Sequence, residues 1–149
     1  MNIFEQINED IKKAMLAKEK EKLEALRAIK AAFLLAKTSE GSNGELTNDQ
    51  ELKIIQKLVK QRQDAAEIYK QQNRPDLYEP ENFQAQIIST YLPTQLSEEE
   101  VQNIVSEIIK ELGAATIKDM GKVMTEANKK LAGQTDSKTL SLIVKKLLS

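Results

Sequence analysis

The sequence of 149 residues is long enough for one globular domain or two small ones, and 40% hydrophobic with 30% charged residues excludes an intrinsically disordered chain. Cysteine and histidine are both absent, which excludes disulfides, a thiol nucleophile, an imidazole base and a Cys/His zinc site. The formal net charge of −1 gives no overall attraction to nucleic acid, so any such binding would depend on a local patch.

The composition also favours helices over strands. Ala, Leu, Glu, Lys and Gln dominate, and they lose little on entering a helix, while 5 glycines and 3 prolines offer few breaks. No run approaches the roughly 18 apolar residues of a membrane span, and residues 1–5 lack a basic region followed by an apolar run. We therefore expect an all-α protein in the cytoplasm, without a membrane partner.

Apolar side chains at helical spacing predict two helices in the first 37 residues. The first covers about residues 3–17 and the second begins near Leu23. The charged run at 18–22 is typical of a solvated face or of a turn between helices. Residues 38–44 form the most loop-like stretch of the sequence.

A longer helix is expected next. Thr47 and Gln50 have the spacing of a capping box, and the apolar stripe continues to about Gln72. A proline at position 75 ends or bends this helix, and a shorter helix then leads into Leu92. This pattern predicts an N-terminal domain, residues 1–92, built around a long helical hairpin, in which Arg62 would form a structural ion pair with a carboxylate.

We expect the domain boundary at residues 93–96, because a proline there is followed at once by a second capping box, Ser97 with Glu100. Three short amphipathic helices are expected in residues 97–149. The first ends at Gly113, the second opens at Thr116, and the third begins near residue 136. Each is too short to be stable alone in water, so they would pack into a small three-helix domain dissimilar from the first.

Residue types that carry catalysis are scarce. The glycines are scattered and none forms a phosphate-binding loop. Acidic residues 98–100 are possible ligands for a hard metal, but their place in the first turn of a helix favours an interaction with the helix dipole. Ser137 and Lys138 are adjacent and do not face each other on a helix, and Ser137 suits a capping role. We expect no catalytic residue, no cofactor and no metal.

Charge asymmetry is the strongest functional signal. From residue 116 onward 7 lysines stand against 3 acidic residues, whereas residues 75–115 hold 1 lysine and 8 acidic residues. Lys122 and Lys129 are seven apart, and Lys138 and Lys145 repeat the interval, so each pair shares a helix face. Two such rows could straddle a phosphate backbone; alternatively, they serve the helix dipole and solubility. The candidate nucleic-acid-binding residues are Lys122, Lys129, Lys130, Lys138, Lys145 and Lys146.

Several motifs resemble the GatB/YqeY family over nearly the whole chain. The opening helices match at residues 8–15 (NEDIKKAM) and 26–32 (LRAIKAA). The most specific match combines residues 58–62 (LVKQR) with the interdomain segment 91–97 (YLPTQLS), and residues 119–124 (DMGKVM) resemble the C-terminal motif. Ala65 and residues 80–83 depart from the family pattern.

The resemblance implies two dissimilar helical bundles. It also implies kinship of the C-terminal bundle with the tail of the GatB subunit of the glutamine-dependent tRNA amidotransferase, which contacts tRNA while the chemistry lies elsewhere. On this basis Lys122 is the best candidate contact. A family label of carbon–nitrogen ligase activity with glutamine as amido donor would then describe the relatives, because this chain has no recognisable nucleotide or amidase site.

Three functions follow as hypotheses. The first is a non-catalytic accessory module that contacts tRNA. The second is an adaptor that docks on a synthetase or amidotransferase component through the long hairpin. The third, an enzyme, would require turnover of an aminoacyl-tRNA or amide donor by the pure protein.

Overall fold

The computed structural model describes residues 2–39 and 44–149. Within these ranges every regular element is helical and none is a strand, so the all-α class is confirmed. The chain divides into two compact units, Met1–Leu92 and Pro93–Ser149, which we call unit 1 and unit 2. Residues 40–43, part of the predicted loop, lie outside the described residues.

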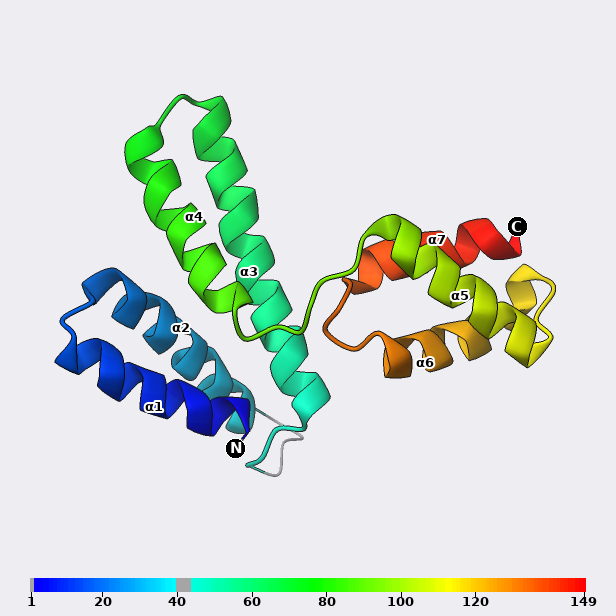
Figure 1. The fold of residues 1–149 in the computed structure, drawn as a ribbon, viewed down its shortest axis with the longest axis horizontal. Helices are drawn as coiled ribbons and strands as arrows, with labels where there is room; N and C mark the ends of the chain where they lie inside the picture. The colour runs from blue at the N-terminus through cyan, green and yellow to red at the C-terminus, as the bar shows by residue number, and fades with distance from the viewer. Residues whose placement is uncertain (1, 40–43) are drawn as a thin grey trace. The chain divides into compact units, whose positions relative to one another are not determined.

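Unit 1 consists of two helical hairpins (Figure 1). Its helices are α1 (Ile3–Leu16), α2 (Lys20–Lys37), α3 (Asn48–Gln71) and α4 (Pro75–Ser89). Helix α1 pairs with α2 and α3 pairs with α4, while α2 also contacts α3 and α4. One cluster of buried side chains joins the two hairpins: Ile7, Ala14, Ala25, Leu26, Ile29, Phe33, Ile55, Val59 and Ile88.

The charged run at 18–22 serves as both a turn and a helix start. Lys18 adopts a left-handed backbone conformation with φ of 57°, which reverses the chain after α1. Helix α2 then begins at Lys20, three residues before the first apolar position of its stripe. The apolar pattern therefore places the start of α2 too late, because the first turn is charged and exposed.

The α3–α4 hairpin follows the sequence pattern at its start and departs from it later. Thr47 and Gln50 form the predicted capping box. Pro75 occupies the first turn of α4, where its missing N–H costs nothing. Pro80 lies inside α4, so the helix continues through a residue that cannot donate to the carbonyl four positions earlier. The second helix is consequently longer than its apolar spacing indicates.

Among the residues that the structure describes, Arg62 does not form the ion pair expected from the sequence. Its Nε donates to Gln84 Oε1 at 2.9 Å, and a terminal guanidinium nitrogen donates to the Leu58 carbonyl at 3.2 Å. Both of these acceptors of the Arg62 guanidinium are uncharged. The hydrogen bond to Gln84 links α3 to α4 across the hairpin.

Unit 2 is a compact group of three α-helices, α5 (Glu98–Leu112), α6 (Met120–Lys130) and α7 (Ser137–Leu148), with a 3-10 turn, η1 (Ile117–Asp119), before α6. All three α-helices contact one another. Ser97 and Glu100 form the predicted capping box, and Gly113, with φ of 63°, caps α5 in the left-handed conformation. The core consists of Val101, Val105, Ile108, Val123, Ala127, Leu131, Leu140, Ile143, Val144 and Leu148.

The segment YLPTQL is anchored at both of its ends. The Tyr91 hydroxyl donates to Asp10 Oδ2 of α1 at 2.5 Å, and burial together with this bond raises the pKa of the Tyr91 phenol. Further along, Gln95 Nε2 donates to the Gly133 carbonyl at 2.6 Å, and the Leu96 N–H donates to the Gln134 carbonyl at 3.0 Å. These hydrogen bonds explain why Tyr91 and Gln95 stand at their positions in the segment.

Glu51 is a buried charge that the sequence did not reveal. It is 4% exposed, and its Oε2 accepts a hydrogen bond from the Phe4 N–H at 3.2 Å. That N–H lies in the first turn of α1 and has no partner within its own helix. Burial raises the pKa of the Glu51 carboxyl, and the Phe4 bond and the Lys37 charge oppose the rise only in part.

We expect Glu51→Gln to raise the thermal stability at pH 7, since its amide oxygen still accepts the Phe4 N–H without a buried charge. Because the pKa of Glu51 is raised on folding, wild-type stability falls as the pH rises from the ordinary value of 4.5 through the folded value. The gain over wild type should therefore shrink as the pH approaches 4.5. Melting curves followed by circular dichroism across this range test it; a pH-independent gain would contradict it.

The separate core of unit 2 predicts that residues 93–149 fold alone. A core of this size supplies a free energy of unfolding of at most about 3–5 kcal/mol. The isolated fragment should show a helical circular dichroism spectrum and a cooperative urea transition. A fragment that is unfolded in buffer would mean that unit 2 depends on the rest of the chain.

Candidate nucleic-acid interface

The six candidate lysines are all exposed side chains of unit 2. Lys122, Lys129 and Lys130 lie on α6, while the other three, Lys138, Lys145 and Lys146, lie on α7. None of them contributes to the core, so all six ammonium groups are accessible to a ligand.

The start of α6 is fixed by a carboxylate. Asp119 Oδ2 accepts hydrogen bonds from the backbone N–H groups of Ala115 at 3.0 Å and Thr116 at 3.3 Å. These bonds, and more weakly the charge of Lys122, lower the pKa of Asp119. The helix expected to open at Thr116 therefore begins with η1 and becomes α-helical at Met120, because this carboxylate closes a tight turn first.

Burial of one stripe sets the direction of the α6 lysines. Val123 and Ala127 are buried in the core of unit 2. Lys122 and Lys129, seven residues apart, lie on the opposite side of the helix. The predicted shared face of these two lysines thus points away from the core.

The lysines of α7 are placed in the same manner. Asp136 caps the helix by accepting the Thr139 N–H at 2.6 Å. The buried residues of α7 are Leu140, Ile143, Val144 and Leu148. Lys138, Lys145 and Lys146 occupy the outward half of the helical circumference.

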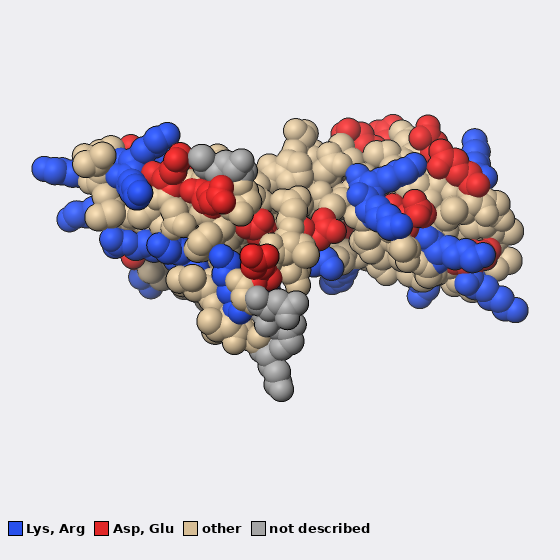
Figure 2. Space-filling model, turned by 90° about the horizontal axis from the view of Figure 1, so that it is seen from below, with Lys and Arg blue, Asp and Glu red and all other residues tan. Residues whose placement is uncertain are grey.

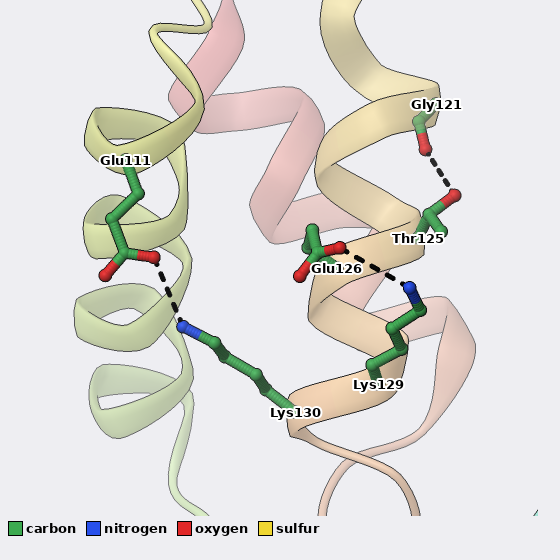
Figure 3. A network of polar contacts seen from close by, with 6 residues as sticks. All are labelled: Glu111, Gly121, Thr125, Glu126, Lys129 and Lys130. Atoms are coloured by element: carbon green, nitrogen blue, oxygen red, sulfur yellow. Dashed lines mark hydrogen bonds and ion pairs between the residues drawn. The ribbon is translucent and has the colours of Figure 1, made fainter.

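Two of the six lysines face carboxylates (Figure 3). Lys129 Nζ lies 3.6 Å from Glu126 Oε1 within α6, and Lys130 Nζ lies 3.4 Å from Glu111 Oε2 on α5. Both pairs are exposed, so each contributes only about 0–1 kcal/mol and can be broken by a competing anion. The first pair is readable from its i, i+3 spacing, whereas the second joins residues that only the fold brings together.

Among the described residues, no ion pair involves Lys138, Lys145 or Lys146. Their ammonium groups are therefore more available to a phosphate than those of Lys129 and Lys130. The resemblance favours Lys122 over the α7 lysines, yet the surroundings of the α7 lysines suit anion binding at least as well.

Unit 2 is formally neutral as a whole. From residue 93 onward, 8 lysines balance 8 acidic residues, with 5 of the acidic residues on α5. Figure 2 shows basic and acidic side chains interspersed on the face drawn there, without a continuous basic surface. Any attraction of a polyanion must therefore arise locally, over the α6 and α7 lysines.

The other candidate sites have structural roles. Residues 98–100 form the first turn of α5, where Glu100 belongs to the capping box. Among the described residues no group of three or more acidic side chains is placed to hold a metal ion. The capping role expected of Ser137 is wrong: Ser137 is the first residue of α7, and Asp136 before it supplies the cap. No helix of the described chain is long and apolar enough to cross a membrane.

Comparisons with known proteins agree with the resemblance seen in the sequence. The family model described as Yqey-like protein matches residues 4–148. A relative from Clavispora lusitaniae (strain ATCC 42720), named Altered inheritance of mitochondria protein 41, mitochondrial, is 34% identical over 107 residues, which are 70% of this chain and 61% of the relative. The chain therefore spans about three fifths of that relative, whose name places the relative in mitochondria and so does not support the cytoplasmic location expected here. With a match over almost its full length, this chain belongs to the YqeY-like protein family.

Proposed function

We propose that the protein is a non-catalytic accessory module that contacts tRNA through the lysines of α6 and α7. One observation carries the proposal: all six lysines are exposed on unit 2, and the three on α7 have no ion pair among the described residues. Phosphates are the ligands that such outward ammonium groups bind. The resemblance of the C-terminal motif to the tail of the GatB subunit selects tRNA among polyanions.

The charge balance predicts a moderate affinity that depends strongly on salt. The carboxylates of α5 cancel the net charge of unit 2, so long-range attraction is weak. Binding would come from contacts between lysines and phosphates, each of which releases a counterion. We expect about three to five such contacts, giving a slope of roughly −0.7 to −0.9 per contact in log K against log salt.

Reversing two charges on α6 tests this proposal. Lys122→Glu combined with Lys129→Glu should reduce tRNA affinity by about tenfold or more and make the salt slope shallower by about two contacts. Both side chains are exposed, so the helical content should not change. Fluorescence anisotropy with labelled tRNA at several salt concentrations measures both quantities.

A matched control uses the acidic partners of lysines in the same surface. Glu111→Gln combined with Glu126→Gln releases Lys130 and Lys129 from their ion pairs, so this variant should bind tRNA more tightly than wild type. If tRNA affinity does not depend on salt and is unchanged by both pairs of substitutions, the proposed interface is ruled out.

A second function, a protein adaptor, is favoured by the far end of the α3–α4 hairpin. No residue between 67 and 84 is buried, so this end extends away from the core of unit 1 (Figure 1). It nevertheless presents Ile68 at 53% exposure and Leu77 at 37%. Apolar groups on an otherwise polar projection suit contact with a protein such as a synthetase or amidotransferase component.

The adaptor function predicts a partner that is retained after nuclease treatment. Affinity capture of a purified synthetase or amidotransferase component should be lost with Ile68→Ser combined with Leu77→Ser. Leu35→Ser, at a position 73% exposed on α2, should leave capture unchanged. Equal capture by wild type and both variants would exclude the hairpin end as the contact.

A further inference from the structure

The outward face of α7 carries an apolar residue among its lysines. Leu142 is 60% exposed and contributes nothing to the core of unit 2. It lies four residues after Lys138 and three and four residues before Lys145 and Lys146, so all four side chains share one helix face. The buried stripe of α7 occupies the opposite face. Leu142 therefore lies between three exposed lysines on this face of α7.

The position of Leu142, more than its exposure, calls for an explanation. Single exposed leucines are common on protein surfaces. On α7, however, a polar residue at this position would leave the core unaltered, whereas leucine interrupts a surface otherwise suited to phosphate. A ligand that fits this face must offer both negative charge and an apolar group. Lys138 and Lys146 are roughly 12 Å apart along the helix axis, so the charged and apolar groups of the ligand must lie closer together than that.

RNA with unpaired nucleotides has this combination. In an uninterrupted A-form duplex the bases are stacked inside, and a side chain on a helix face meets only phosphates and 2′-hydroxyls. In a loop or a single-stranded end, bases are splayed out and can be packed against a side chain, with the phosphates a few ångströms away. Apolar aliphatic side chains make such contacts with bases in other complexes.

We infer that Leu142 packs against an unstacked base of bound RNA while Lys138, Lys145 and Lys146 hold the neighbouring phosphates, so that the protein selects looped or single-stranded RNA over uninterrupted duplex. This inference rests on the proposed function and narrows its ligand. It assigns Leu142 to selectivity and the three lysines to affinity.

The test compares two RNA probes with the full chain: a stem–loop, and a blunt duplex with the same number of phosphates. Wild type should bind the stem–loop more tightly. Leu142→Ser should weaken stem–loop binding by about tenfold, the scale of one lost base contact, and leave duplex binding and the salt slope unchanged. Leu142→Met, which keeps an apolar side chain, should restore stem–loop binding. Lys145→Glu combined with Lys146→Glu should weaken both probes and reduce the salt slope.

The outcomes separate this inference from the proposed function. If Leu142→Ser leaves stem–loop affinity unchanged, or weakens both probes equally, the role of Leu142 is overturned while RNA binding stands. If wild type binds neither probe in a salt-dependent manner, RNA binding and the inference fail together. Binding of the protein to anionic phosphatidylserine vesicles, with neither RNA bound, would overturn both as well. Leu35→Ser serves as the control for loss of an exposed leucine elsewhere.

Discussion

Mutual burial of one apolar stripe per helix is the constraint on which both units depend. The three α-helices of unit 2 have 15, 11 and 12 residues, lengths at which an isolated helix is marginal in water. They persist because their valine, isoleucine and leucine side chains form one shared core. The side chains on the inward half of each helix are therefore buried in the core, and only those on the outward half can contact a ligand.

This constraint explains why much of the fold is readable from the sequence. The capping boxes at Thr47 and Ser97 and the left-handed Gly113 are local devices, each decided by residues within one turn. The stripe spacing follows from the helical period alone. That period is enough to place Lys122 on the outward face of α6. The direction of a side chain on an amphipathic helix is a local property.

What could not be predicted involves partners distant in sequence or a balance between competing terms. Arg62 meets Gln84, and Lys130 meets Glu111, only because the fold brings separate helices together. In the sequence, Glu51 is only an acidic residue in the first turn of a helix. No neighbouring residue indicates that its carboxylate accepts a hydrogen bond from the Phe4 N–H. Helix α4 also continues through Pro80, which local rules read as a break, and no single neighbour in the sequence indicates this. The helical period does place Leu142 on the lysine face of α7, but a pattern of charges alone gives an apolar residue no functional signal.

Local field, more than net charge, decides whether a neutral unit can bind a polyanion. At physiological salt, charges on exposed groups are screened beyond about 8 Å, so α5 carboxylates weaken an α7 lysine only where they lie that close. Lys130 is the clear case of such proximity, since Glu111 lies 3.4 Å away. Lys138 and Lys145 have no such ion pair among the described residues. The acidic residues of α5 thus keep unit 2 close to neutral, while within the described chain the lysines on the outward face of α7 form no ion pair.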